Sequence, residues 1–247
     1  MNDPFRIYMK VKVKEGQLDN FLPRAANVIE YLKKSAPEML QFEVFANHET
    51  NEVVWLESFK QVSSYDLHLA NFANPEMQEL TGKAMQLQES IESIYVMGEP
   101  SETAKAAFKQ FGMDAKILSP WPGTIRLAES REENNIQSLV TMQLSDMAAY
   151  RKISEQVESA AETQSGVLFH RSYQMNDNEA VAFEEYSSSA SLLEWVPVAL
   201  ENLGDFTSLV QGMTYEVFGT PSQECKTALD EWGAKYYKRH AGFVRFE

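Results

Sequence analysis

The sequence of 247 residues contains a single cysteine, Cys225, so no disulfide can form within the chain. We expect this thiol to be packed rather than reactive, because no catalytic motif surrounds it. No apolar run approaches the roughly 20 residues that a membrane span needs. The first residues also lack the basic start and apolar core of a secretion signal. We therefore expect a cytoplasmic protein without membrane contact.

Basic residues are scarce: 22 lysines and arginines face 36 acidic residues, which gives a formal net charge of −14. This charge repels nucleic acid, and no local basic cluster overcomes it. The sequence also lacks paired histidines at metal spacing, a glycine-rich nucleotide loop and a Gly-x-Ser-x-Gly motif. We therefore expect no nucleic-acid partner, no metal and no cofactor.

An internal repeat is the most informative feature that is present. The segment Gly98–Gly112 returns as Gly219–Gly233, a shift of 121 residues, with six of fifteen positions identical. Chance from composition would give about one identity. In both copies a proline and a serine precede a helical run that stops at a glycine, which predicts a strand exit, a capped helix and a stop. A second echo, Pro122–Arg126 against Ala241–Arg245, predicts a short closing strand in each half.

The first half has the pattern β-α-β-β-α-β. Alternating apolar residues predict strands at 5–13, 40–46, 53–59 and 91–97. Apolar spacings of three and four predict helices at 18–34, from Ser63 or Ser64 through Leu69, and at 75–87. This order is the ferredoxin-like arrangement, an antiparallel sheet with helices on one face.

The second half follows the same outline, with strands at 136–144, 166–173, 180–186 and 213–218 and helices at 147–161 and 192–200. We therefore predict an α+β protein with repeats at 1–128 and 136–247, joined by a polar linker at 129–135. A sheet covered on one face leaves the other face apolar, so two such sheets should pack back to back. The expected architecture is an intramolecular dimeric α+β barrel, a pseudo-dimer; further homo-oligomerisation stays open.

The stretch Val54–Phe59 followed by Ser64–Asn71 resembles the central signature of the antibiotic biosynthesis monooxygenase family. In that family a strand ending in an acidic and an aromatic residue precedes a short helix that carries a histidine. The resemblance implies a pocket between sheet and helices for a small aromatic ligand. Some members oxygenate phenols or quinols with dioxygen and no cofactor, and related members degrade haem.

His68 matches the histidine of this motif, and a general base that removes a phenolic proton is the role that the resemblance implies. The alternative is an imidazole packed at the edge of the core. Trp55, Phe59 and Tyr65 would shape the pocket for substrate. Glu57 lies on the same strand face as the two strand aromatics; it either orients a histidine or reaches water at the strand end, and we favour water.

The second half has lost the motif histidine, because the equivalent position is Trp195. Trp195 either stacks on a ligand or fills the space between helix and sheet. We therefore expect two unequal repeats, with any ligand chamber surviving chiefly in the N-terminal one. The main hypothesis is an oxygenase with His68 as base, and the alternative is a barrel that binds small molecules or is purely structural. A haem-binding relative ranks third, with His170 as the nearest candidate axial ligand.

Overall fold

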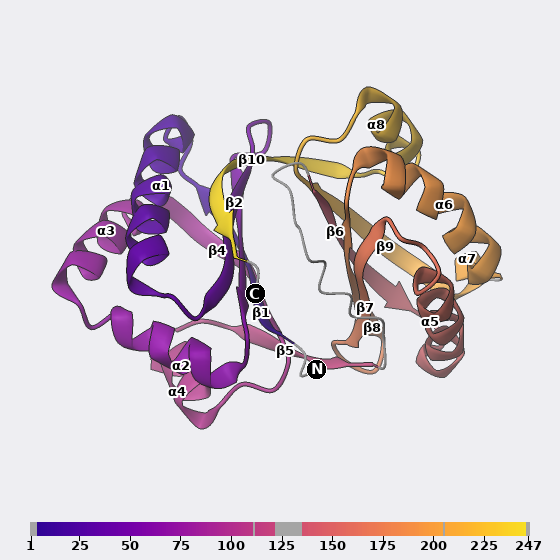
Figure 1. The fold of residues 1–247 in the computed structure, drawn as a ribbon, viewed down its shortest axis with the longest axis horizontal. Helices are drawn as coiled ribbons and strands as arrows, with labels where there is room; N and C mark the ends of the chain where they lie inside the picture. Colours follow the sequence, from indigo (N-terminus) through magenta and orange to yellow (C-terminus); the bar gives the residue numbers. More distant parts are fainter. Residues whose placement is uncertain (1–3, 111, 122–134, 205, 246–247) are drawn as a thin grey trace. The chain divides into compact units, whose positions relative to one another are not determined.

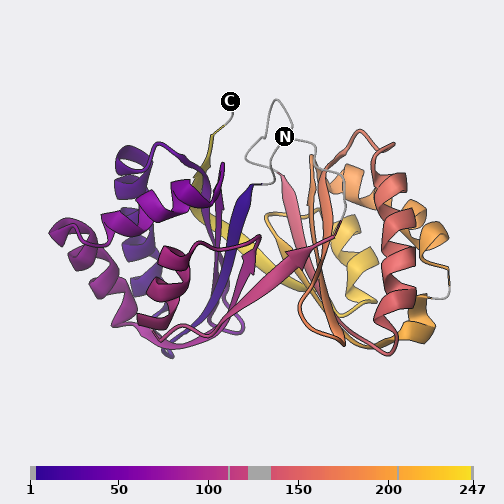
Figure 2. The same cartoon turned by 90° about the horizontal axis from the view of Figure 1, so that it is seen from below.

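The computed structural model describes residues 4–110, 112–121, 135–204 and 206–245. These residues form two compact units: unit 1 comprises Met1–Ile117 and Tyr237–Glu247, and unit 2 comprises Leu118–Tyr236. In each unit the helices lie on one face of an antiparallel sheet (Figures 1 and 2). None of the described helices is long and apolar enough to cross a membrane.

Unit 1 contains the predicted β-α-β-β-α-β order. Its elements are β1 (Phe5–Val13), α1 (Leu18–Ser35), β2 (Met39–Asn47), β3 (Glu52–Phe59), α2 (Val62–Asn71), α3 (Pro75–Met85), β4 (Gln88–Met97) and α4 (Glu102–Gln110). The strand order is β4-β1-β3-β2, extended at β2 by β10 (Lys235–Val244). The predicted strands and helices are therefore confirmed within a few residues at their ends.

Unit 2 repeats this order. It contains β6 (Ile136–Leu144), α5 (Met147–Ala161), β7 (Val167–Gln174), β8 (Glu179–Tyr186), α6 (Ser189–Leu203), α7 (Phe206–Leu209), β9 (Val210–Phe218) and α8 (Gln223–Asp230). The strand order is β9-β6-β8-β7, extended at β7 by β5 (Ala115–Pro120). Only the single-turn helix α7 and the strand β5 have no counterpart in the sequence prediction.

The closing strands do not stay with their own repeats. The end of β5, which follows the first repeat in sequence, pairs with β7 at Ser119 and Pro120. Strand β10 ends the second repeat and pairs with β2 from Lys238 to Val244. Through these two strands the order of all ten is cyclic, β1-β3-β2-β10-β9-β6-β8-β7-β5-β4. The predicted α+β fold of two ferredoxin-like repeats is confirmed, with the strand topology expected of a pseudo-dimer.

The compact units consequently differ in extent from the sequence repeats at 1–128 and 136–247, which stay a prediction about the duplication. The linker at 129–135 lies outside the described residues except for Asn135, and the closing strand predicted at Pro122–Arg126 lies entirely outside them.

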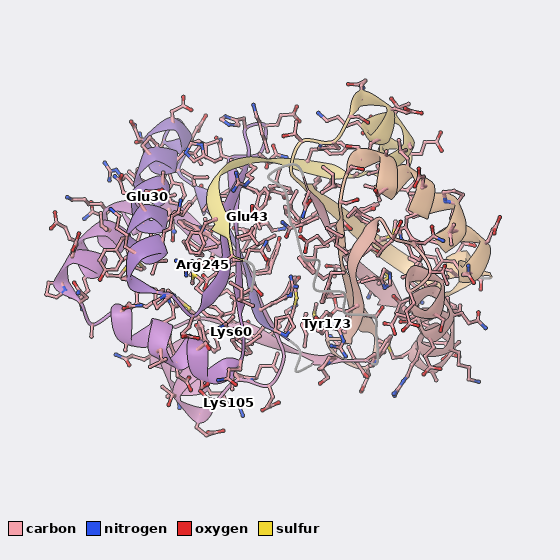
Figure 3. The ribbon with its side chains drawn as sticks, viewed as in Figure 1. Glu30, Glu43, Lys60, Lys105, Tyr173 and Arg245 are labelled. Atoms are coloured by element: carbon pink, nitrogen blue, oxygen red, sulfur yellow. The ribbon has the colours of Figure 1, made fainter. Side chains whose placement is uncertain are left out.

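The C-terminal strand is anchored in unit 1 by two arginines. Arg239 Nε donates a hydrogen bond of 2.7 Å to Glu43 Oε1 on β2. The guanidinium of Arg245 donates to the carbonyl oxygens of Lys33, Ala36 and Met39, where α1 passes into β2. Figure 3 labels Glu43 and Arg245 within this unit. Charge-assisted bonds of this kind hold the swapped strand in register.

Two glycines show that the repeats share backbone geometry as well as sequence. Gly98 follows β4 with a φ of 120°, and Gly219 follows β9 with a φ of 121°. A side chain is strained at this φ in either place. At Gly219 an added Cβ would also meet the carbonyl oxygen of Asn135 at 2.9 Å. The repeated glycine is therefore required by the turn that leaves the sheet.

The apolar core of each unit lies between its sheet and its helices. Helix α1 buries one stripe of unit 1, which consists of Leu18, Phe21, Leu22, Ala25, Val28, Ile29 and Leu32. Burying each larger side chain of this kind contributes about 1.5–3 kcal/mol relative to leaving it in water. Cys225 on α8 is fully buried in the core of unit 2 and forms no disulfide, as expected for a packed thiol.

Candidate functional site

Each unit holds a cavity between its sheet and its helices. The N-terminal cavity, in unit 1, has a volume of about 120 Å³. The C-terminal cavity, in unit 2, has a volume of about 80 Å³. The second repeat thus keeps a smaller cavity of its own, and which of the two holds a ligand stays a prediction. No group of three or more potential metal-ligating side chains gathers among the residues that the structure describes.

The N-terminal cavity is apolar apart from a few groups. Strand alternation brings Trp55 and Glu57 of β3 to the helix-facing side of the sheet, and α2 brings His68 above them. Helix α3 closes the space; Asn74 caps this helix by accepting a hydrogen bond from Glu76 N at 2.9 Å. The other lining residues are mostly apolar: Met9, Val28, Leu32, Phe42, Phe72, Met77, Thr81, Ala84, Met85, Gln88, Ile91 and Met113.

His68 and Glu57 form the polar centre of this cavity. His68 Nε2 lies 3.9 Å from Glu57 Oε2, which is too long for a direct hydrogen bond. Burial raises the pKa of Glu57 to about 8, and burial lowers the pKa of His68 to about 4. Both groups are consequently uncharged at neutral pH. His68 Nδ1 is buried without a hydrogen-bond partner among the described residues. Nε2 faces Glu57 across the 3.9 Å gap, and a ligand hydroxyl between them can contact both groups.

The other predicted residues divide between the two units. Phe59 and Tyr65 pack against the imidazole of His68, with ring centroids 5.4 and 6.0 Å away, but neither lines the N-terminal cavity. The pKa of the Tyr65 hydroxyl is raised by burial and by the nearby Glu57 and Asp66, so it stays protonated. Trp195 lines the C-terminal cavity instead and packs edge-on against His170 at 5.6 Å. Glu57 faces the cavity, so the expectation that it reaches bulk water is wrong.

The C-terminal cavity contains a polar network that sequence reasoning missed. Glu184 of β8 is the repeat equivalent of Glu57 and lies at its centre. Its carboxylate contacts His170 Nε2 at 3.3 Å and accepts hydrogen bonds from Ser138 Oγ at 2.6 Å and Tyr186 OH at 2.7 Å. Burial alone would raise the pKa of Glu184, but the bonds and attraction of these three donors outweigh it, so the pKa lies below its ordinary value. Glu184 is therefore an anion at neutral pH.

Strand register explains why the two glutamates differ. On the neighbouring strands Glu57 pairs with Ile7 and Phe42, whereas Glu184 pairs with Ser138 and His170. Two residues further along its own strand, Glu57 has Phe59 where Glu184 has Tyr186. Three apolar neighbours in unit 1 are thus three hydrogen-bond donors in unit 2. The sequence does contain a signal for this network. If Glu57 is aligned with Glu184, the residues expected beside them on the neighbouring strands are apolar in the first repeat and hydrogen-bond donors in the second.

Fold and site together define a two-repeat α+β protein with a separate cavity beneath each sheet. Residues 4–80 match the family model described as antibiotic biosynthesis monooxygenase. The match covers most of the first ferredoxin-like repeat and leaves the second repeat unmatched, so it shows a similarity of this segment to the family. No protein with a curated description matches the sequence significantly.

Solved structures share the fold over most of the chain. Two putative monooxygenases are similar, one from Lactobacillus acidophilus NCFM and one from Fusobacterium nucleatum subsp. nucleatum. The first is 12% identical with a TM-score of 0.63, covering 99% of this chain and 98% of its own. The second is 10% identical with a TM-score of 0.62, covering 86% of this chain and 89% of its own. At these identities the similarity shows the fold alone.

Proposed function

We propose that the N-terminal cavity binds a single-ring hydroquinone or phenol and that the protein oxygenates it with dioxygen, without a cofactor. His68 is the general base. The family match supports the reaction class. The observation that carries the proposal is the uncharged imidazole of His68, which lines an apolar cavity with an open nitrogen beside a protonated carboxyl.

The volume of the cavity limits the substrate. An engineered apolar cavity of about 150 Å³ binds benzene, and the N-terminal cavity has about 120 Å³. A single substituted ring therefore requires the lining side chains to move apart slightly, whereas a fused polycyclic ring system exceeds the volume by far. Trp55, Phe42 and Phe72 give the cavity an aromatic wall against which such a ring would stack.

Proton transfer from a phenol to His68 is unfavourable, but its free-energy cost is smaller than the activation barrier of a typical enzyme reaction. A phenol has a pKa near 10 and His68 one of about 4, a difference that corresponds to about 8 kcal/mol. Attraction between the resulting phenolate and imidazolium at about 4 Å recovers about 4 kcal/mol. The remaining cost of about 4 kcal/mol fits within the barrier of about 16 kcal/mol that a turnover of about 10 s⁻¹ implies. Glu57 in its protonated form adds no negative charge that would oppose the phenolate.

The reaction balances without an external reductant. The hydroquinone anion gives electrons to dioxygen, a bond forms between a ring carbon and oxygen, and the O–O bond breaks with release of water. 1,4-Hydroquinone and dioxygen thus yield 2-hydroxy-1,4-benzoquinone and water. The substrate supplies all the electrons, which is consistent with a site that needs no bound redox group.

Oxygen uptake with 1,4-hydroquinone tests the proposal. We expect enzyme-dependent uptake above the autoxidation rate, with hydroxybenzoquinone as product. His68→Ala should lower the rate about 10²- to 10⁴-fold, the usual contribution of a general base. His48→Ala is the matched control, because His48 is an exposed histidine of the β2–β3 turn. Full activity of His68→Ala would overturn the role of His68. Saturable binding without oxygen uptake would instead assign a binding protein.

A further inference from the structure

Glu57 is the second polar group at the centre of the N-terminal cavity, and the role of His68 as base leaves it without a task. Its side chain is 11% exposed and lines the cavity. The described residues provide no hydrogen bond to its carboxyl, and His68 Nε2 stays 3.9 Å away from Oε2. Buried polar groups nearly always have a hydrogen-bond partner. A carboxyl that lacks one at a cavity wall therefore indicates a ligand atom that supplies it.

The sheet around Glu57 offers no such partner. Strand β3 lies between β1 and β2, and the residues paired with Glu57 there are Ile7 and Phe42, which are both apolar. Helix α2 brings two titratable groups near the carboxyl, Tyr65 and His68. Among the described residues that line the cavity, His68 is the only titratable one besides Glu57. A ligand in this cavity therefore meets these two groups and an otherwise mostly apolar wall.

The two groups have complementary hydrogen-bonding capacity. Burial raises the pKa of Glu57 to about 8, so at neutral pH its carboxyl carries an O–H that can donate. Burial lowers the pKa of His68 to about 4, so its imidazole is neutral and can accept at Nε2. A donor and an acceptor thus face each other across one gap of 3.9 Å. A hydroxyl group both accepts and donates, and it fits between them.

We propose that Glu57 is a second catalytic residue: its carboxyl donates a hydrogen bond to the hydroxyl oxygen of the bound phenol or hydroquinone, while His68 Nε2 accepts the hydrogen of that hydroxyl. This inference rests on the proposed function. Hydrogen bonds to an ionised partner are about twice as strong as those between neutral groups. Glu57 therefore stabilises the phenolate that reacts with dioxygen more than the bound phenol, and a group that does so lowers the barrier.

Binding of phenol and toluene to the full chain tests the hydrogen bond without turnover. Toluene has nearly the size of phenol but leaves both protein groups unpartnered. We expect isothermal titration calorimetry at pH 6.5 to show that Glu57→Met weakens phenol at least five-fold relative to toluene, the effect of about one neutral hydrogen bond. Glu49→Met, at an exposed glutamate of the β2–β3 turn, is the matched control and should leave the ratio unchanged. An unchanged ratio in Glu57→Met would overturn the inference.

Steady-state kinetics with 1,4-hydroquinone test the catalytic effect. Glu57→Met should lower kcat about 10²- to 10³-fold, the usual effect of removing one such donor, and should change KM less than about ten-fold. Glu57→Gln keeps a weaker N–H donor that does not ionise, so its kcat should lie between those of the wild type and Glu57→Met. The wild type should lose activity as the pH rises through 8, because Glu57 then ionises and can no longer donate. Glu57→Gln should lack this loss.

The outcomes separate this inference from the proposed function. An active wild type beside a Glu57→Met variant with unchanged kcat would overturn the catalytic role of Glu57. The same pH profile in the wild type and in Glu57→Gln would also overturn it. If the wild type takes up no oxygen, the proposed function fails instead, and the ratio of phenol to toluene affinity still decides whether Glu57 donates to a ligand hydroxyl.

Discussion

The two cavities place equivalent glutamates in opposite states. Glu57 lies among Ile7, Phe42 and Phe59 and holds a proton at neutral pH, because burial raises its pKa to about 8. Glu184 has hydrogen-bond donors at the corresponding positions and is ionised. The two glutamates lie on equivalent strands and are buried to the same extent, so neither strand position nor burial determines which of them is charged. The neighbours on adjacent strands decide it.

The histidines reinforce this difference. His68 reaches the N-terminal cavity from helix α2 and stops 3.9 Å from Glu57, whereas His170 lies on strand β7 and contacts Glu184 at 3.3 Å. Each repeat thus keeps one histidine near its glutamate, but from a different element. In unit 1 the gap leaves room for a ligand to come between the two groups. In unit 2 the pair is closed, and the remaining space is lined by aromatic rings.

The largest expected effect is a difference in the free energy of unfolding between variants of the two glutamates. Glu184→Met would leave the donors Ser138, Tyr186 and His170 buried without their acceptor, so we expect a loss of about 3–5 kcal/mol. Glu57→Met removes a carboxyl for which the described residues provide no hydrogen bond, so its effect should lie within about 1 kcal/mol and can be stabilising. Urea unfolding of the full chain at pH 7 measures both. Equal losses of stability in the two variants would contradict the proposed difference between the two glutamates.

A single donor tests the network at finer scale. Tyr186→Phe removes the hydroxyl that donates to Glu184 at 2.7 Å and makes the position resemble Phe59. A hydrogen bond to a charged group contributes about 1.5–3 kcal/mol, and we expect a loss of this size in urea unfolding. Tyr65→Phe is the matched control in unit 1, because Tyr65 is also buried but donates no hydrogen bond to a carboxylate within the described residues, and it should cost less than Tyr186→Phe. If Tyr186→Phe loses no more stability than Tyr65→Phe, the hydrogen bond from Tyr186 to Glu184 does not stabilise the protein as we expect.

The protonated state of Glu57 should appear as a pH dependence of stability. Because its pKa is raised from 4.5 to about 8 in the folded protein, the folded state keeps a proton that the unfolded chain loses above pH 4.5. This contribution is complete below pH 4.5 and falls as the pH rises through 8. Between pH 6.5 and 7.5 the free energy of unfolding should fall by about 1 kcal/mol more in the wild type than in Glu57→Gln. Parallel pH profiles would contradict a raised pKa.

The smallest effect compares the helices that carry His68 and Trp195. Helix α6 is capped by Ser188, whose side chain accepts from Ser191 N, whereas the equivalent Gln61 before α2 makes no capping bond. Ser188→Ala should therefore cost about 1 kcal/mol, and Gln61→Ala close to nothing. Thermal unfolding of the two variants measures the difference, and a larger loss at Gln61 would show that α2 depends on contacts other than its cap.

Much of the fold follows from local pattern. Alternation along 5–13 predicts β1 closely, and three- and four-residue spacing along 147–161 predicts α5 closely, because each has one clearly apolar face. The exchange of β5 and β10 between repeats has no local signal. Pairing partners so far apart in sequence are selected by tertiary packing, which a short apolar pattern does not specify.

The site was predictable only in part. His68 and Trp55 do line one cavity, because a helix position and a strand position can be placed on faces from spacing alone. Their role in catalysis stays a prediction. The network around Glu184 was missed because its members come from β6, β7 and β8, and each residue looks ordinary within its own strand. Only the register of three strands brings them together.

The most direct test of the opposite charge states is a pH titration of the glutamate carboxyl carbons by ¹³C nuclear magnetic resonance on the full chain. Glu57→Gln and Glu184→Gln assign the two signals. We predict a midpoint near 8 for Glu57 and one below 4.5 for Glu184. Midpoints that coincide near 4.5, or that fall in the reverse order, would contradict the account.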